Sequence, residues 1–305
     1  MKYPIYKIQT FDKVEQLGTK EKFWFYTKED NISRLCKFGR LKTGENWAEK
    51  VASEIAELLT IPCAKYDFAM YMDRECVIST NFVPEYCRLI HGNELLVNLI
   101  NKHYPKNQKY KVTEYKLTVV EKIFRDLKGV INLPIGYLKH PSVTFAMDMF
   151  ISYLMLDCLI SNQDRHHENW GIIFDSKKQK YYLTPTYDHA SSLGCRISDE
   201  EREKRLTTSD KRYAISAFVK RAKTPIYNNK FERLNTFDAF WKIARKNKKS
   251  ALYWIDKLNN ITNDSLTKIF DRVPDHLISC VAAEFAVSII KENKSRLIKA
   301  KEKLT

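Results

Sequence analysis

The most informative part of the sequence is Asn162-Gln163-Asp164-Arg165-His166-His167-Glu168-Asn169-Trp170, and Tyr187-Asp188-His189 follows it. Asn169 lies five residues after Asp164, and Asp188 lies 24 residues after it. The D-x-x-x-x-N spacing predicts a short loop that turns back, so that both side chains face one site. A carboxylate such as Asp164 can hold and deprotonate a hydroxyl group. Asn169 and Asp188 offer oxygen ligands of the kind that Mg²⁺ prefers.

Protein kinases use this polar skeleton to bring a hydroxyl, Mg²⁺ and ATP together. The D-x-x-x-x-N spacing often occurs by chance, so the interpretation depends on the elements expected on either side of it. An apolar helix is expected at 143–160, and short strands at 171–174 and 181–183 surround a turn. These strands would hold Asp188 opposite the Asp164 loop. A simpler alternative is that these Asp and Asn residues only cap backbone groups in turns.

Composition narrows the class of protein. The chain has 305 residues, of which 44% are hydrophobic, so general disorder is excluded and a large core is expected. The first residues, MKYPIYKIQTFDK, carry charges where an export signal has its apolar run. The longest apolar stretch contains Asp148 and Asp157, which favours a buried helix over a membrane span.

The seven cysteines are scattered and form no C-x-x-C pair, which argues against a zinc ribbon or a disulfide framework. We therefore expect a cytoplasmic protein, with secretion as an effector without a classical signal left open.

The formal charge of +15 is concentrated downstream of the catalytic motif. Residues 201–249 contain 15 Lys or Arg and five Asp or Glu. This basic segment could attract nucleic acid, an acidic protein surface or a protein already bound to nucleic acid. The alternative is a solvated, lysine-rich helical surface without a dedicated ligand.

The order of expected elements is that of a kinase small lobe followed by a helical lobe, an α+β, bilobal arrangement. We expect a strand-rich N-lobe over residues 1–83 and a mainly helical C-lobe over residues 84–305. The N-lobe strands are expected at 5–11, 23–26, 34–38, 66–72 and 75–80, with a helix at 46–59. Further helices are expected at 92–103, 116–128, 237–243, 251–258 and 276–301. The junction at 81–85 would be a hinge, and we assign Asn81 and Phe82 there to nucleotide binding.

Lys37 lies on the third expected strand, where a lysine can reach the α and β phosphates of ATP if a helix carboxylate holds it. Two glutamates on the 46–59 helix, Glu49 and Glu54, compete for that role. Lys37 could instead be an ordinary strand lysine, and Glu49 could belong to a capping box with Asn46.

The phosphate loop has an unusual composition. Gly18 is the only glycine between the first two strands, so G-x-G-x-x-G is absent, as is the Walker-type motif. We assign Gly18 and its neighbour Thr19 to nucleotide binding.

His166, His167 and His189 invite a different interpretation, a metal-dependent hydrolase or nuclease. Adjacent histidines on a loop point in different directions, however, and no H-x-x-x-H or H-E-x-x-H spacing brings two imidazoles to one zinc ion. We therefore predict that His166 orients the loop by hydrogen bonding. A third possibility is a non-catalytic, basic nucleic-acid-binding module based on residues 201–249.

The quoted residues resemble those of the HipA-like Ser/Thr protein kinases, and most of all the short, CtkA-like members. The resemblance extends over residues 34–193 and rests on the Asp-Arg-His-x-x-Asn core at 164–169, the 187–193 stretch, Lys37 and the Ala48-Glu49 helix. It implies a kinase-like fold, Mg-ATP, and phosphorylation of a protein Ser or Thr.

Carried over by position, the resemblance makes Asp164 the catalytic base and Asn169 and Asp188 the metal ligands. It makes Lys37 the phosphate lysine, with Glu49 rather than Glu54 as its partner. It also implies a toxin-type or effector kinase, an antitoxin or other regulatory partner, and autophosphorylation in the phosphate loop. Thr19 is the only Ser, Thr or Tyr between Phe11 and Tyr26.

Overall fold

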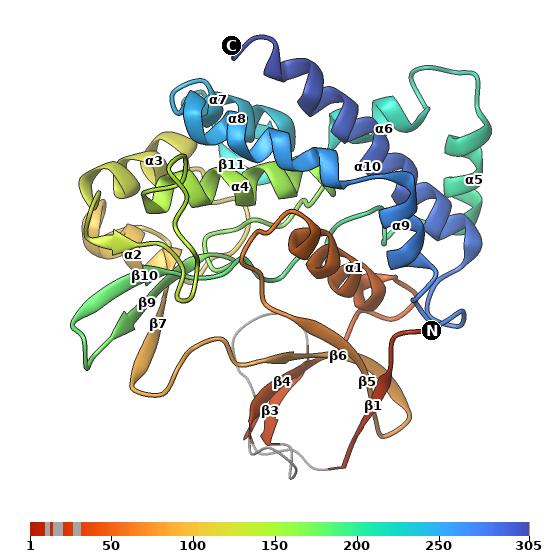
Figure 1. Ribbon diagram of the computed structural model, residues 1–305, viewed down its shortest axis with the longest axis horizontal. Coiled ribbons are helices and arrows are strands. Elements are labelled where there is room, and N and C mark those ends of the chain that lie inside the picture. The colour runs from red at the N-terminus through yellow and green to blue at the C-terminus, as the bar shows by residue number, and fades with distance from the viewer. Residues whose placement is uncertain (10–12, 15–20, 27–31, 305) are drawn as a thin grey trace.

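The computed structural model describes residues 1–9, 13–14, 21–26 and 32–304 (Figure 1). A six-stranded sheet occupies the N-terminal part of the chain, and helices with smaller sheets make up the rest. The predicted α+β class, with strands first and helices later, is confirmed. The exact division between two lobes at residue 83 stays a prediction.

The N-terminal sheet has the strand order β1-β5-β6-β4-β3-β2. All neighbours pair antiparallel except β1 and β5, which are parallel. Alternate residues of β3, Phe23 and Phe25, are buried in a small cluster with Cys36 of β4, as expected for a strand with one covered face. The bounds are β1 Ile5–Ile8, β2 Lys13–Val14, β3 Lys22–Tyr26, β4 Ser33–Lys37, β5 Tyr66–Tyr71 and β6 Arg74–Thr80.

Helix α1 (Glu45–Leu58) lies between this sheet and the C-terminal helices (Figure 1). Trp47, Val51 and Ile55 recur at helical spacing and are fully or almost fully buried in the main core. Helix α1 packs against β5 and β6, and this contact fixes the position of its polar side chains relative to the sheet.

A second sheet has the order β7-β9-β10-β8, and its first strand is a correction to our expectation. We expected helices directly after the junction at 81–85, but β7 (Cys87–His91) comes first and pairs antiparallel with β9 (Gly171–Asp175). Strand β7 has only five residues, and its partner β9 lies 80 or more positions later in the chain. The local sequence therefore gives little sign of a strand. The other two strands are β8 (Ile131–Asn132) and β10 (Lys180–Leu183).

Helix α4 (Ala146–Leu159) is the centre of the C-terminal part. It is buried almost all round and packs against α7, α8 and α10, as predicted for the long apolar stretch. No helix among the described residues is long and apolar enough to cross a membrane. The remaining helices are α2 Gly92–Leu99, α3 Leu117–Asp126, α5 Asp199–Thr207, α6 Ile215–Arg221, α7 Thr236–Ala244, α8 Lys248–Lys257, α9 Asn263–Phe270 and α10 Cys280–Lys301, with a short 3-10 helix, η1, at Leu258–Asn260.

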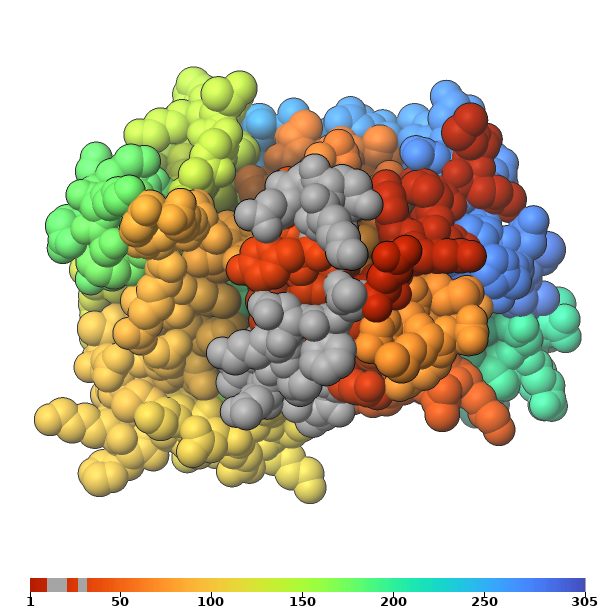
Figure 2. All heavy atoms as spheres, turned by 90° about the horizontal axis from the view of Figure 1, so that it is seen from below, coloured from red at the N-terminus to blue at the C-terminus, as the bar shows by residue number. Residues whose placement is uncertain are grey.

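Further elements that we did not expect lie in or next to the basic segment. They are α5, α6 and a hairpin of β11 (Lys223–Tyr227) and β12 (Arg233–Asn235). The two-residue strands β2 and β8 were not expected either. Helix α9 was also missed. Figure 2 views the molecule from the side of the N-terminal sheet, with the gold and yellow chain after residue 85 on one side and the teal and blue C-terminal part on the other.

Candidate active site

A cavity of about 450 Å³ lies between the N-terminal sheet and the loop at 162–170 that contains Asp164 and Asn169. Most of the predicted site residues line it, although they are far apart in the sequence. Those that line it are Lys37, Asn81, Phe82, Asp164, His166, Asn169 and Asp188. Gly18 and Thr19 lie outside the described residues.

Lys37 is the charged centre of this cavity. Its Nζ lies 2.8 Å from Oε2 of Glu49 and also contacts Oδ1 of Asp188. Burial lowers the pKa of Lys37, but the two carboxylates outweigh it and hold the pKa well above its ordinary value. Lys37 is therefore a buried, paired cation and not the solvated strand lysine of the simpler alternative.

Glu49, and not Glu54, is the carboxylate that meets Lys37. Glu54 binds Lys50 at 2.7 Å and the Tyr3 hydroxyl at 2.9 Å on another side of α1. The capping-box alternative for Glu49 is wrong, because α1 begins at Glu45 and Gly44 is its N-cap. The Asn46 side chain instead accepts a hydrogen bond from the Gly39 backbone at 2.9 Å.

The second oxygen of Glu49 ties α1 to the loop that carries Asp188. Its Oε1 accepts a hydrogen bond from the His189 backbone N–H at 2.5 Å. Asp188 has a φ of 58°, in the left-handed region that Asp tolerates better than most residues. Its own N–H donates to the Tyr66 hydroxyl at 3.2 Å. Glu49 thus fixes both the lysine and the backbone beside the predicted metal ligand.

The loop at 162–170 turns back as the spacing predicted. The Asn169 side-chain amide donates to the Asp164 carbonyl at 2.6 Å, and the His166 N–H donates to the same carbonyl at 2.8 Å. With the amide nitrogen used in this way, the side-chain oxygen of Asn169 is the atom that can face a cation. Oδ2 of Asp164 accepts from Ser191 Oγ at 3.3 Å and lies 3.5 Å from the Tyr110 hydroxyl.

A buried ion pair that we did not predict holds this loop in place. The Arg165 side chain is fully buried and contacts the Asp157 carboxylate of α4 at 2.7 Å. Arg165 also donates to the Asn169 carbonyl at 2.6 Å, so it bridges α4 and the far end of the loop. Asp157 in an apolar helix was the available signal, because a charge is rarely buried without a partner.

The three histidines do not converge on one point. Nδ1 of His167 lies 2.6 Å from the Tyr104 hydroxyl, and Nε2 of His189 lies 3.1 Å from Arg165 and 2.8 Å from Thr186. Among the residues the structure describes, no group of three or more His, Cys, Asp or Glu could hold a metal ion. This geometry gives the hydrolase alternative no ligand set.

His166 lies in the loop as predicted, and its ring accepts a hydrogen bond from the Glu168 backbone at 3.2 Å. Burial lowers the pKa of His166, and likewise of His167, to about 4, so both rings are neutral at pH 7.

Flat side chains also line this cavity. Phe82 stacks on Tyr187 with ring centroids 5.3 Å apart, and the Tyr187 hydroxyl donates to the Glu168 carbonyl at 2.8 Å. Asn81 lies beside them, where its side-chain oxygen accepts from the Val83 N–H at 3.0 Å. Sequence reasoning found Asn81 and Phe82 from the hinge, but it missed Tyr187 as their packing partner.

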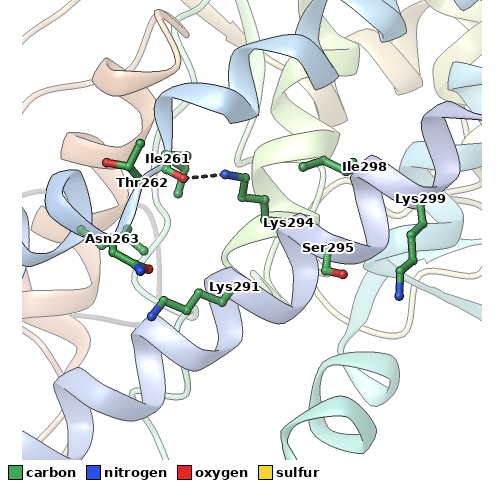
Figure 3. Close-up of a pocket in the computed structure, with 9 residues that line it drawn as sticks. Ile261, Thr262, Asn263, Lys291, Lys294, Ser295, Ile298 and Lys299 are labelled. Carbon is green, nitrogen blue, oxygen red and sulfur yellow. Dashed lines mark hydrogen bonds between the residues drawn. The ribbon is translucent and has the colours of Figure 1, made fainter.

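A second cavity, of about 520 Å³, lies between α10 and the start of α9 (Figure 3). Lys294 reaches across it to the Ile261 carbonyl at 2.6 Å. Lys291 and Lys299 extend in different directions, so they present no common binding point (Figure 3). None of the predicted site residues lines this cavity.

Comparison with known proteins places this site in a family. Residues 15–263 match the HipA-like C-terminal domain. The curated serine/threonine-protein kinase CtkA of Helicobacter pylori is 28% identical over 155 residues, which are 50% of this chain. The matched region covers 44% of CtkA, less than half of that relative.

Solved structures share the fold. The crystal structure of the Helicobacter pylori proinflammatory kinase CtkA aligns with a TM-score of 0.73 at 19% identity, covering 99% of this chain and 98% of that one. HipA from Shewanella oneidensis, in a complex with HipB and operator DNA, aligns with a TM-score of 0.59 at 10% identity, over 97% of this chain and 68% of that one. The resemblance stated from the motifs is therefore confirmed, and the chain belongs to the HipA-like C-terminal domain family.

Proposed function

We propose that this chain is an ATP- and Mg²⁺-dependent protein Ser/Thr kinase. The observation that carries the proposal is the grouping around Lys37, which is paired with Glu49 and Asp188 in the same cavity as Asp164 and Asn169. Kinase chemistry needs these charges in one place, because phosphoryl transfer depends on positioning and on neutralising phosphate charge. The serine/threonine kinase named among the relatives supports it.

The nucleotide would lie with its base against Phe82 and its phosphates toward Lys37. The Asn169 oxygen and the Asp188 carboxylate are hard oxygen donors, which fits Mg²⁺. When bound, Mg²⁺ neutralises negative charge on the phosphates. Lys37 adds a second positive charge. Glu49 keeps the Lys37 amine directed at the phosphates and away from solvent.

Asp164 would act on the acceptor. It accepts the proton of a Ser or Thr hydroxyl while the hydroxyl oxygen bonds to the γ-phosphorus and the bond to ADP breaks. The Asn169 amide and the His166 N–H both hold the Asp164 backbone, so the carboxylate keeps its direction. In this scheme the chain's own Thr19 is a further acceptor.

The setting of the reaction is part of the same proposal. A protein substrate, a toxin-type or effector role in the cytoplasm, and an antitoxin or other regulatory partner are what the family suggests. The related HipA was solved with HipB and operator DNA, which supports a regulatory protein or a DNA-bound complex as the partner class.

The test is incubation of the pure protein with labelled ATP and Mg²⁺, followed by mapping of phosphate by mass spectrometry. Asp164→Asn should lose roughly 10²- to 10⁴-fold in transfer while nucleotide affinity stays close to that of the parent. Asp188→Ala should weaken the binding of Mg-ATP itself, measured by calorimetry. Parental turnover in Asp164→Asn would show that the loop is not catalytic.

Self-phosphorylation has its own readout in that experiment. Phosphate on Thr19 would place close to two negative charges beside the nucleotide phosphates and should weaken ATP binding. An unmodified Thr19 in an active preparation would rule out this regulation while leaving the kinase proposal intact.

A further inference from the structure

Two arginines from distant parts of the sequence bind the same buried carboxylate, Glu45, at the active-site cavity. Arg40 follows β4 and lines the active-site cavity, and Arg196 follows the loop that carries Asp188. Their side chains are 42% and 46% exposed. The transfer chemistry proposed above uses neither of them.

A buried carboxylate holds both arginines in position. The Glu45 side chain is fully buried, and its Oε1 accepts from Arg40 at 2.6 Å and from Arg196 at 2.9 Å. Oε2 of Glu45 also accepts from the Arg40 backbone N–H at 3.1 Å. The Glu45 carboxylate therefore holds both guanidinium groups from its buried position, and both arginine side chains stay partly exposed. Buried ion pairs of this kind fix the direction of the exposed donors.

Arg196 is also connected to the predicted catalytic base. Its Nη2 donates to Ser191 Oγ at 2.6 Å, and Ser191 Oγ donates to Asp164 Oδ2 at 3.3 Å. Burial and Asp164 raise the pKa of Tyr110 to about 12, and Arg40 and Arg196 oppose that rise. Both guanidinium groups thus act on the hydroxyl that lies next to Asp164, where an acceptor side chain would enter.

The donors of Arg196 are not all used. Its contacts with Glu45 and Ser191 go through Nε and Nη2. Nη1 makes no hydrogen bond with any residue that the structure describes. Since a guanidinium group carries five N–H donors in a planar fork, Arg196 can bind a further anion without giving up Glu45.

We propose that Arg40 and Arg196 recognise an acidic group close to the acceptor Ser or Thr in the protein substrate. This inference rests on the proposed kinase function and names its substrate class. Arginine binds carboxylate and phosphate through paired, charge-assisted hydrogen bonds. A lysine in the same place would meet two positive charges and be rejected. Glutamate and phosphoserine share the required chemistry, and the test separates them.

The experiment compares peptides that share one Ser acceptor and differ in a single flanking residue, which is Glu, phosphoserine, Gln or Lys. We expect kcat/KM for the Glu or the phosphoserine peptide to exceed that for Gln by roughly tenfold or more, with Lys the poorest. Whichever of the two acidic peptides is better identifies the group. If the parent protein prefers the Gln or the Lys peptide, the proposal is overturned, and no variant is needed to show it.

Variants then test the two residues. In Arg40→Gln/Arg196→Gln the ratio of kcat/KM for acidic over Gln peptides should fall to about one. Because the ratio is taken within one protein, a general loss of activity cancels. Arg212→Gln is the matched control, since Arg212 is 88% exposed and paired with Asp210 on the α5–α6 connection. It should keep the parental ratio.

The outcomes separate this inference from the kinase proposal. If the parent phosphorylates the peptides or itself but shows no preference for acidic peptides, only the assignment of Arg40 and Arg196 is overturned. If Arg40→Gln/Arg196→Gln keeps the preference for acidic peptides, that assignment is overturned as well. No transfer to any peptide or to the chain itself by the parent overturns both.

Discussion

Glu49 connects three elements of the candidate active site. One of its oxygens binds Lys37 and the other binds the backbone after Asp188, so a single buried carboxylate connects a strand, a helix and a loop. An unpaired buried charge costs several kcal/mol, which makes this arrangement hard to replace. Glu54, five residues further along α1, shares none of these contacts.

This difference predicts unequal effects of matched substitutions. Lys37→Ala should abolish measurable transfer, and Glu49→Gln should reduce it at least tenfold, because the amide binds the lysine without a charge. Glu54→Gln should change transfer less than twofold, since Glu54 binds Lys50 and Tyr3. Phosphate incorporation from labelled ATP measures all three. A greater loss from Glu54→Gln than from Glu49→Gln would contradict the assignment.

At the scale of elements, the Asp164 loop is anchored by the Asp157–Arg165 pair. Both side chains are almost fully buried, and Arg165 also binds the Asn169 carbonyl. Asp157→Leu should therefore lower the free energy of unfolding by about 3–5 kcal/mol, because it leaves Arg165 buried without its counterion. Asp126→Leu is the control, since its pair with Lys122 is exposed and its loss should change the free energy of unfolding far less than Asp157→Leu does. Urea denaturation measures both.

The histidines of the same loop predict how stability depends on pH. Burial lowers the pKa of His166 and His167 to about 4, whereas an unfolded histidine titrates near 6.5. Between these values the unfolded chain binds more protons than the folded one, so stability falls as pH is lowered from about 6.5 to 4. Each histidine contributes up to about 1.4 kcal/mol per pH unit.

The variant His167→Gln should reduce that pH slope, and His103→Gln, at an exposed position, should leave it unchanged. Unfolding free energies measured by urea denaturation at several pH values give the slope. An equal slope in all three proteins would show that burial of the loop histidines does not control it.

The elements that the sequence predicted are those with a local signal. Helix α1 has apolar residues at helical spacing, and the D-x-x-x-x-N spacing itself predicts a loop that turns back. Strand β7 was missed because its partner β9 lies far along the chain and the five residues Cys87–His91 are only partly buried. The Asp157–Arg165 contact and the Arg40–Glu45 contact were missed although their residues are only eight and five positions apart. Tertiary packing decides them, and spacing along the chain does not.

At the scale of the whole molecule, the basic segment is divided between two regions. Helices α5 and α6 pack on α10, whereas α7 packs on α4 and leads into α8 (Figure 1). Several of its cations are paired within the fold, such as Arg205 with Glu201 and Lys246 with Glu121. The count of 15 Lys and Arg therefore overstates the charge that one face can present to a polyanion.

This division leads to a test of whether the start of α8 is a docking surface. Lys246, Lys248 and Lys249 are exposed, and reversing all three to Glu should weaken RNA or DNA binding and flatten its dependence on salt, since fewer counterions are released. Self-phosphorylation should stay at the parental level, because these lysines line neither described cavity. The charge-matched control reverses Lys211, Lys220 and Arg221, which lie in the α5–α6 region and are also exposed. Equal weakening by both triple variants would indicate a diffuse effect of net charge, and no weakening by either would identify the segment as a solvated surface.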